Sequence, residues 1–234
     1  MKFIISKKIL EKYPKLNIGI VIVKGIDNKG KNKEIDKLLK EVEDYINLNF
    51  TPEALSKHEM ISPWRTVYSE FGSKPSKYHS SIEALMRRIL KGNKIPLVSK
   101  LVDLYNYLSL KHLIPMGSDD IDKVDGDILL TFAEGSEKFA PLGSPDVIEN
   151  PDKDEVVYKD SSKILCRKWN WRDSDETKIT EDSKNVILYV EGLPPISRKK
   201  LISVCKELAE LITAFCKGEA KYYILNKAKS SAEF

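Results

Sequence analysis

The segment Asn17–Lys24 (NIGIVIVK) constrains the fold more than any other part of the chain. It is rich in β-branched residues, and its apolar centre is not interrupted by polar residues. A strand with this pattern is covered on both faces, because both sets of alternating side chains are apolar. The fold must therefore place a layer on each side of this strand. A hydrophobic fraction of 41% over 234 residues can supply such a core.

Helical patterns dominate the first half of the chain after this strand. Apolar residues recur with a 3.6-residue period over residues 33–48. Ser62, followed by a proline, predicts a capped helix start, and Ser80 with Glu83 has the spacing of a capping box. A further amphipathic helix is predicted over residues 99–112. The first half is thus mainly helical.

After Pro115 the pattern changes to short strands separated by turns. Strands are predicted over residues 127–133, 155–159, 164–169 and 185–191, followed by a helix over 201–215 and a strand at 221–226. Helices in the middle and strands late in the chain predict an α+β fold rather than a doubly wound one.

The turn-rich region between residues 49 and 62 is the only candidate boundary in the chain. Residues 1–60 are therefore predicted to form an N-terminal strand–helix extension packed on a core domain of residues 61–234. No internal repeat or Gly/Ser-rich linker suggests any other division.

Composition predicts a soluble cytoplasmic protein with no membrane partner. The apolar runs are far shorter than the roughly 20 residues that span a bilayer, and no signal-peptide pattern begins the chain. Cys166, Cys205 and Cys216 lack CxxC spacing, so reduced thiols are expected rather than disulfides or a metal site. The net charge of +4 does not identify a partner.

Three sequence motifs in the later part of the chain are characteristic of one family. They are SSIEALMRRILKG at 80–92, VDLYNYLSLKHLIPMG at 102–117 and CRKWNWRDSDETKIT at 166–180. In this order they resemble the B3/4 domain of the phenylalanyl-tRNA synthetase β subunit, and above all its freestanding relatives. The likeness covers roughly residues 60–192. It implies a sandwich-like, mostly antiparallel sheet flanked by helices.

The resemblance also implies a function. The synthetase domain removes a wrongly attached tyrosine from the tRNA that should carry phenylalanine. Such ester hydrolysis needs a positioned water, stabilisation of an oxyanion and a selective pocket. By this likeness, tRNA or aminoacyl-tRNA is the expected partner, a small amino-acid ligand is possible, and no cofactor is required. The chain is not expected to be a complete aminoacyl-tRNA ligase.

The sequence departs from the family pattern at three editing positions. The family histidine after the motif proline is Gly117 here, an arginine falls on Pro96, and a glutamate falls on Tyr189. Glu191 lies two residues after Tyr189 and would face the same side of a strand. These changes leave three hypotheses: a deacylase acting in trans, a tRNA or amino-acid binding module that has lost the chemistry, and a protein that scavenges a free amino acid.

Polar residues near these positions are candidates for the site. In an extended WNWR strand, Asn170 and Arg172 would share a face and could bind substrate, although a surface arginine beside packed tryptophans is the alternative. Ser118, Asp119 and Asp120 predict a pocket rim or, alternatively, a capped helix N-terminus. The pocket is expected between Gly117 and WNWR.

The candidate residues fall into three groups. Candidate catalytic residues are Asp119, Asp120 and Glu191; candidate substrate-binding residues are Gly117, Ser118, Asn170, Arg172 and Thr177; candidate RNA-binding residues are Arg198, Lys199 and Lys200. The last group could attract phosphate backbones or could simply be a solvated basic surface.

Overall fold

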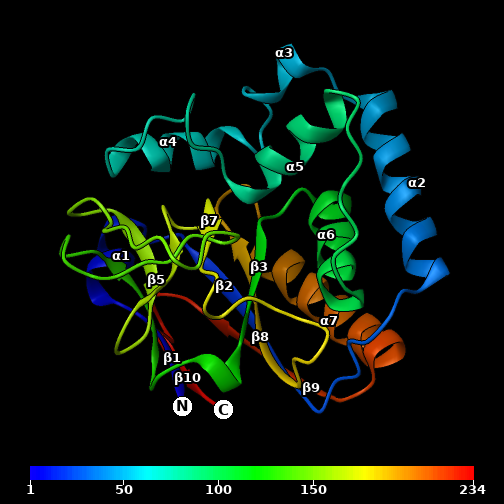
Figure 1. Cartoon of the computed structure of the whole chain (residues 1–234). Coiled ribbons are helices and arrows are strands. Elements are labelled where there is room, and N and C mark those ends of the chain that lie inside the picture. Colours follow the sequence, from blue (N-terminus) through cyan, green and yellow to red (C-terminus); the bar gives the residue numbers. More distant parts are fainter.

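The computed structural model describes the whole chain, residues 1–234, as two sheets packed face to face with helices around them (Figure 1). In spatial order, the first sheet contains β10 (Ser231–Glu233), β1 (Lys2–Ile5), β4 (Ile128–Phe132), β5 (Val156–Lys159), β6 (Ile164–Arg167) and β7 (Arg172–Asp173). All neighbours in it are antiparallel except β1 and β4, which run parallel.

The second sheet is antiparallel throughout. Its strands are, in order, β3 (Met116–Asp120), β8 (Asn185–Gly192), β2 (Asn17–Lys24) and β9 (Glu219–Leu225). Ile18 and Ile20 of β2 join the core between the two sheets, whereas Val21 and Val23 join a second core on the other face. The expectation that this strand is covered on both faces is confirmed.

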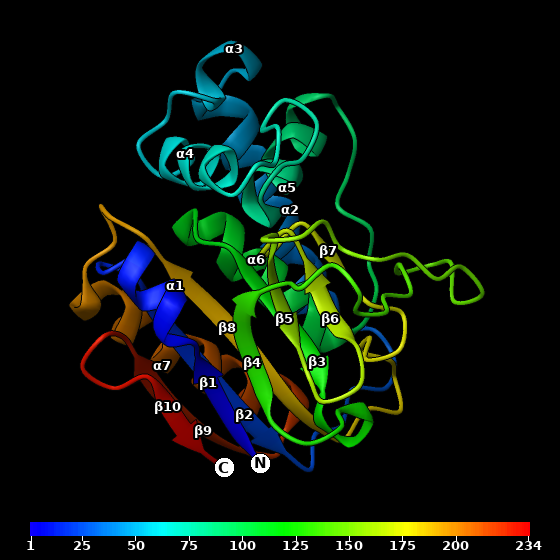
Figure 2. The same cartoon turned by 90° about the vertical axis from the view of Figure 1, so that its left-hand side faces the viewer.

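Helices form the remaining layer of the molecule. They are α1 (Lys7–Lys12), α2 (Lys33–Asn49), α3 (Pro52–Leu55), α4 (Ser62–Glu70), α5 (Ser81–Leu90), α6 (Lys100–His112) and α7 (Arg198–Cys216), with a 3-10 helix η1 (Ile121–Lys123) after β3. α6 and α7 contribute to the core on the outer face of the second sheet, and α2 packs against α6. α4 lies across the upper ends of the sheets (Figures 1 and 2).

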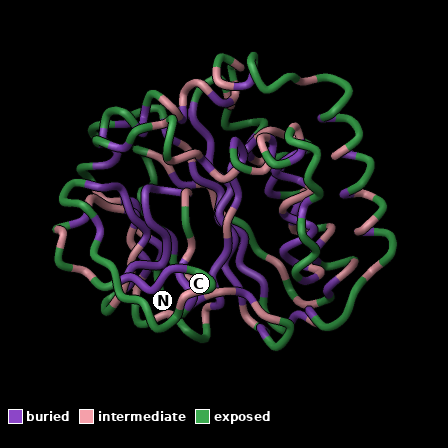
Figure 3. The backbone as a smooth tube through the Cα atoms, turned by 45° about the horizontal axis from the view of Figure 1, so that its top comes forward, coloured by how far each residue is buried: buried purple, intermediate pink, exposed green.

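Burial follows these layers. The buried backbone is concentrated in the strands of both sheets and on the inner sides of the helices (Figure 3). The core between the sheets is rich in aromatic side chains, among them Phe3, Tyr158, Trp169 and Tyr189. This aromatic core is continuous with the candidate site described below.

Two sheets of mainly antiparallel strands flanked by helices confirm the predicted α+β class. The segment before residue 61 supplies β1 and β2, which pair with strands from the later chain in both sheets. This segment therefore contributes one strand to each of the two sheets. The division of the chain at residue 60 stays a prediction.

Several local predictions are wrong. Ser118 does not cap a helix, because Gly117 to Asp120 belong to β3, whose backbone groups pair with β8. Ser62 lies inside α4, and Ile61 precedes the helix without a side-chain cap. Ser80 does cap α5, but the Glu83 carboxylate binds Arg65 and Arg87 instead of closing a capping box.

Two further features concern the cysteines and the helices. All three cysteines are buried and form no disulfide, as the sequence predicted.

No helix in the protein has both the length and the apolar character needed to cross a membrane.

Candidate functional site

A small pocket with a cavity volume of about 60 Å³ lies at the upper end of the core between the two sheets. Its walls come from β3, β5, β6, β7, β8, the turn after β6 and the first turn of α5. The lining residues are Ser81, Met116, Gly117, Tyr158, Cys166, Trp169, Asn170, Trp171, Asp173, Tyr189 and Glu191. Segments far apart in the sequence thus meet at one place, including Gly117 and the WNWR segment.

The turn after β6 brings three of these side chains, Trp169, Asn170 and Trp171, into the pocket wall. Lys168 and Trp169 have φ angles of 47° and 67°, in the left-handed region that non-glycine residues rarely adopt. The chain therefore reverses direction at this point, and the predicted strand over 164–169 ends at Arg167. The expectation that Asn170 and Arg172 share one face of an extended strand is wrong.

A buried ion-pair network stabilises this turn. The Glu155 carboxylate is 1% exposed and accepts hydrogen bonds from the Arg167 guanidinium at 2.9 and 3.0 Å and from Lys168 Nζ at 2.7 Å. It also accepts from the backbone N–H of Lys168 at 3.0 Å. The Glu155 carboxylate therefore fixes both the side chain and the backbone at the point where the strained turn begins.

Asn170 lies in the turn with its amide held from both sides. Its Oδ1 accepts a hydrogen bond from Tyr68 Oη of α4 at 2.8 Å, and its Nδ2 donates to Glu191 Oε2. Because the tyrosine donates to the oxygen, the amide N–H₂ must point at the carboxylate. Asn170 thus orients Glu191.

Glu191 is the only glutamate on the pocket wall, and it has no cationic partner. Its side chain accepts hydrogen bonds from Tyr158 Oη and Asn170 Nδ2, both neutral donors. Desolvation in this site raises the pKa of Glu191 to about 7, against the lowering effect of these donors and of the nearby Trp169 indole. Near neutral pH the carboxyl group can therefore accept or donate a proton.

Asp119 forms a second buried carboxyl group behind the pocket. It accepts hydrogen bonds from Thr177 Oγ1 at 2.5 Å and Tyr189 Oη at 2.9 Å, and desolvation raises its pKa to about 7. The Tyr189 ring lines the pocket and lies 4.6 Å from the Tyr158 ring, centroid to centroid. Asp119 and Thr177 thus contact the pocket through Tyr189 rather than directly.

The ionisable carboxyl groups of the pocket wall have no basic side chain beside them in the wall. Asp173 of β7 is the second carboxyl group on the wall, and desolvation raises its pKa above the ordinary value. No lysine, arginine or histidine side chain lines the pocket. The remaining walls are mainly aromatic, from Tyr158, Trp169, Trp171 and Tyr189. This combination suits a cation attached to an apolar group.

The other predicted site residues lie in different surroundings. Gly117 lines the pocket, and a Cβ at this position would have only Tyr189 Cδ2 nearby, at 3.9 Å. Ser118 is buried and Asp120 accepts a hydrogen bond from Ser183 Oγ at 2.6 Å, so neither lines the pocket. Arg172 is exposed and donates to the Leu142 carbonyl at 2.8 Å. The structure thus separates Ser118, Asp120 and Arg172 from the pocket.

The predicted RNA-binding residues begin α7, on the outer side of the second sheet. Lys200 Nζ lies 3.0 Å from His112 Nδ1, and Glu207 contacts both His112 and Lys111. Arg198 and Lys199 have no ion-pair partner. Two cations thus remain free on this surface.

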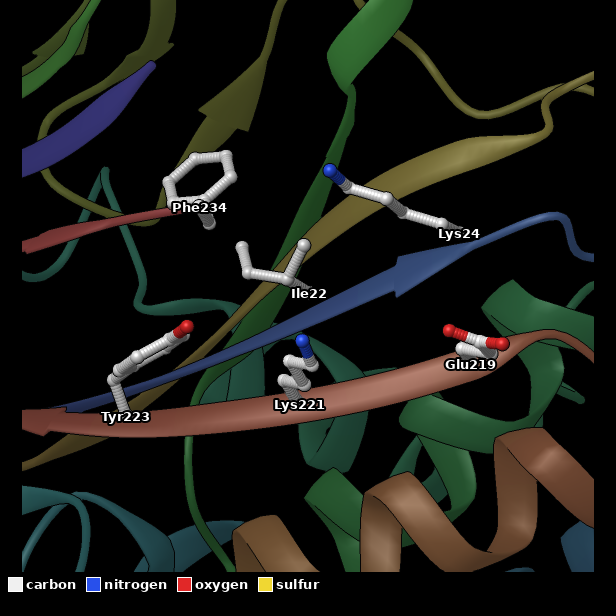
Figure 4. Close-up of a pocket in the computed structure, with 6 residues that line it drawn as sticks. All are labelled: Ile22, Lys24, Glu219, Lys221, Tyr223 and Phe234. Carbon is white, nitrogen blue, oxygen red and sulfur yellow. The ribbon is translucent and has the colours of Figure 1, made fainter.

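Another depression lies at the opposite, lower end of the sheets. Its walls are Ile22, Lys24, Glu219, Lys221, Tyr223 and Phe234 (Figure 4). Lys24 and Lys221 extend from the neighbouring strands β2 and β9, and Phe234 faces them from the end of the chain (Figure 4). The two lysines are exposed and make no ion pair. This depression has no buried titratable group and is not a candidate active site.

Sequence reasoning missed Tyr68, Ser81, Tyr158 and Asp173 as parts of the site. A signal existed for Tyr158, because a tyrosine hydroxyl inside an otherwise apolar strand needs a buried hydrogen-bond partner. Nothing in the sequence marks Tyr68 or Ser81, since their role depends on how α4 and α5 lie over the sheets. Asp173 was missed because the prediction of an extended chain through residues 164–172 was wrong, and the position of Asp173 depends on the turn that replaces it.

Comparison with protein families gives one match: the B3/4 domain model aligns with residues 63–217, about two thirds of the chain. The chain belongs to the B3/4 domain family. The family match includes every residue of the pocket wall. No curated protein sequence matches the chain.

Among solved structures, the chain is similar to an N-terminal fragment of the phenylalanyl-tRNA synthetase β-subunit from Pyrococcus horikoshii. The identity is 16% and the TM-score is 0.46, over 93% of this chain and 49% of the fragment. The chain thus spans about half the length of that fragment.

Proposed function

We propose that this protein binds the aminoacylated end of a tRNA in the pocket and hydrolyses a mischarged aminoacyl ester in trans. The observation that supports this most is the charge of the pocket wall, where Glu191 and Asp173 are the only charged side chains. An aminoacyl ester carries a free α-ammonium group and no free carboxylate. Its charge therefore complements the wall.

The same charge argues against a free amino acid as the ligand. A free amino acid would bring its own carboxylate into a pocket that holds two carboxyl groups and no cation. Burying an unpaired charge beside like charges is unfavourable. An ester or amide of the amino acid avoids this cost. The scavenging hypothesis therefore has less support than a ligand esterified to tRNA.

Glu191 is the group we assign to proton transfer. With a pKa of about 7, a substantial fraction is ionised at neutral pH and can take a proton from an attacking water. The water oxygen adds to the ester carbonyl, and the bond to the ribose oxygen then breaks. The proton held by Glu191 passes to that leaving oxygen. Tyr158 and Asn170 keep the carboxylate in one orientation during these steps.

The basic start of α7 is the proposed contact for the tRNA backbone. α6 ends at His112, beside Lys200, and the chain then leads directly through residues 113–115 into β3 and Gly117 of the pocket wall. Free cations near one end of this short connection can attract phosphates while the aminoacyl group enters the pocket. Arg198 and Lys199 are the available cations.

The test is a deacylation assay with a panel of tRNAs, each carrying a non-cognate amino acid. At least one should lose its amino acid faster with the protein than without it, and Glu191→Gln should remove this effect. In parallel, an amino-acid methyl ester should bind more tightly than the same free amino acid. Equal binding of ester and free acid, with no deacylation, would contradict the proposal.

A second candidate is a binding module that no longer hydrolyses. It is favoured by Gly117, which places no side chain where the family resemblance implies a histidine. The two candidates differ in one result. A binding module would bind a stable amide-linked aminoacyl-tRNA analogue but leave the natural ester intact over hours.

A further inference from the structure

Two hydrogen-bond donors on the pocket wall have no partner. The Trp169 side chain is fully buried, and its indole Nε1–H forms no hydrogen bond. The buried Ser81 Oγ, in the first turn of α5, also forms none. Buried indole N–H groups usually have a partner, and leaving a buried donor unpaired costs roughly 1–3 kcal/mol. These two groups therefore need an explanation.

The position of Trp169 is also costly for the backbone. Trp169 and Lys168 both have positive φ angles, which the Glu155 network holds in place. The ring packs between Trp64 and Tyr13, at centroid distances of 5.4 and 5.2 Å. A strained turn, a buried ion network and two aromatic contacts thus fix an indole whose N–H forms no hydrogen bond of normal geometry and has the Glu191 carboxyl group as its polar neighbour.

We infer that Trp169 Nε1–H and Ser81 Oγ–H donate to the carbonyl oxygen of the bound aminoacyl group. This inference rests on the proposed function and assigns a further pair of catalytic residues to it. An indole N–H can only donate, so the ligand atom that it meets must be an acceptor. The carboxyl groups of Glu191 and Asp173 are left for the ammonium group and the water.

The same two hydrogen bonds would stabilise the oxyanion that forms during hydrolysis. When the water oxygen adds to the carbonyl carbon, the π-bond electrons move onto the carbonyl oxygen, which becomes an oxyanion. Two neutral donors at this oxygen bind it more strongly than the uncharged carbonyl. When the oxyanion collapses, the carbonyl re-forms, the ribose oxygen leaves, and it takes the proton from Glu191. The donors return to their starting state.

The first experiment observes the indole directly. The chain has three tryptophans, Trp64, Trp169 and Trp171, so the three indole ¹⁵N–¹H signals can be assigned with single Trp→Phe variants. The probes are methyl esters of apolar and aromatic amino acids, each paired with the amine that lacks the ester group. The Trp169 signal should move downfield with an ester but not with the matching amine. Equal shifts with both members of a pair overturn the inference.

The indole also lies near the Glu191 carboxylate, which provides a control for this experiment. If Glu191 were the true partner, Glu191→Gln would move the Trp169 indole signal in the free protein by as much as an ester does in the wild type. That result also overturns the inference. We expect the Glu191→Gln shift to be much the smaller of the two.

The second experiment uses kinetics. Trp169→Phe keeps an aromatic ring but removes the donor, and it should lower kcat about 10²–10³-fold with little change in KM. Ser81→Ala should lower kcat in the same manner. The matched control is Trp171→Phe, a half-buried tryptophan of the same wall, which should lose less than Trp169→Phe. Thermal unfolding checks that each variant is folded.

The outcomes separate this inference from the proposed function. If the wild-type protein neither binds an ester nor deacylates any tRNA, the proposed function is wrong. If the wild type does deacylate, and folded Trp169→Phe and Ser81→Ala keep its kcat, only the donor assignment is wrong. In case Trp169→Phe does not fold, Ser81→Ala and the indole spectrum still decide the matter.

Discussion

Glu155 and Glu191 are two buried glutamates in neighbouring parts of the core with opposite electrostatic surroundings. They are 1% and 2% exposed, so neither side chain contacts water, although Glu155 lies nearer the surface, where its cationic partners also contact the exposed Asp152 and Glu149. Desolvation raises the pKa of each, but in Glu155 the contacts with Arg167 and Lys168 outweigh it and hold the pKa below its ordinary value. Glu191 has only neutral donors, and its pKa rises to about 7.

This difference shows that, among carboxylates shielded from water, the charge of the partner is needed to offset desolvation and keep the group ionised. A carboxylate paired with two cations stays ionised and acts as a structural anchor. A carboxylate bonded only to neutral donors stays close to its protonated form and can exchange a proton. The turn of residues 168–171 connects the two sites, since it is fixed by Glu155 and delivers Asn170 to Glu191.

The largest expected effect concerns Glu191, the carboxylate that has no cationic partner. Glu191→Gln should lower kcat for deacylation by about 10²–10⁴-fold, because the variant cannot take a proton from water. The variant should remain folded at pH 8, because a neutral amide replaces a group whose ionisation is costly there. Asp120→Asn is the control, since that carboxylate bonds Ser183 away from the pocket and should leave kcat within about twofold. Equal losses in both variants would contradict the assignment.

The next largest effect concerns Glu155, the carboxylate that is paired with two cations. Glu155→Gln leaves the buried Arg167 and Lys168 with weaker partners, and it should lower the free energy of unfolding by about 3 kcal/mol. Glu149→Gln is a matched control, because Glu149 contacts the same guanidinium at 2.7 Å but its side chain is 44% exposed. It should cost less than about 1 kcal/mol. Urea unfolding measures both values. A Glu155→Gln protein as stable as the wild type would contradict the structural role assigned to Glu155.

The shifted pKa values of Glu191 and Glu155 also predict how stability depends on pH. The pKa of Glu191 is about 7 in the folded protein against an ordinary value of 4.5, so the folded state binds more protons between these pH values. Stability must therefore fall as pH rises through this window, by on the order of 2–3 kcal/mol for this group. For Glu155, with a lowered pKa, stability is instead lost as pH falls below the ordinary value.

The measurement is the free energy of unfolding at pH 5 and pH 8. Wild-type protein should be less stable at pH 8 on account of Glu191 and of Asp119, whose pKa is raised in the same direction. Glu191→Gln should remove its share of the difference, whereas Glu149→Gln should not change it. If Glu191→Gln leaves the difference as large as in the wild type, Glu191 is ionised at an ordinary pKa and cannot be the proton-transfer group assigned here.

Much of this arrangement was accessible from the sequence. Periodicity located β2, β8 and α6 within one residue at each end, because their apolar patterns are long and regular. The family motifs placed Gly117, Asn170 and Glu191 near one another. Those residues all lie on one pocket wall.

The errors have one physical source. Patterns of local spacing cannot reveal a chain reversal that is stabilised by a distant carboxylate, and Glu155 lies 12 residues before Arg167. The turn at Lys168 and Trp169 contains no glycine or proline to mark it. For the same reason, Ser118 to Asp120 were open to a helical interpretation until the pairing of β3 with β8 fixed them as a strand. Tertiary contacts override local preference at both places.

Asn170 and Arg172 sharpen the comparison within one short segment. Asn170→Ala leaves the buried Tyr68 hydroxyl and one oxygen of Glu191 without a partner, and it should cost roughly 1–3 kcal/mol of stability and lower kcat. Arg172→Ala removes one exposed contact with a carbonyl and should change stability by less than about 0.5 kcal/mol. Urea unfolding and deacylation kinetics measure both. Equal effects would contradict the buried role assigned to Asn170 and the exposed role assigned to Arg172.

The smallest expected effect extends the comparison to cations on the surface. Arg198 and Lys199 are free, whereas Lys200 contacts His112, so neutralising all three should weaken tRNA binding mainly through the first two. The slope of log K against log salt should fall by roughly 0.7–0.9 for each phosphate contact that is lost.

The control for this surface is the pair Lys24 and Lys221 at the lower end of the sheets, which are also exposed and unpaired (Figure 4). Replacing both with glutamine should leave the salt slope unchanged if tRNA follows the path from α7 to the pocket. Binding to any basic surface would instead lower the slope in both sets of variants. That outcome would contradict a specific path, yet it would leave the roles of Glu191 and Trp169 intact, because neither depends on surface charge, which salt largely screens. Deacylation of a short aminoacyl ester that has no phosphates should be the same in wild type and in both sets of variants, and this separates the RNA contact from the chemistry of the pocket.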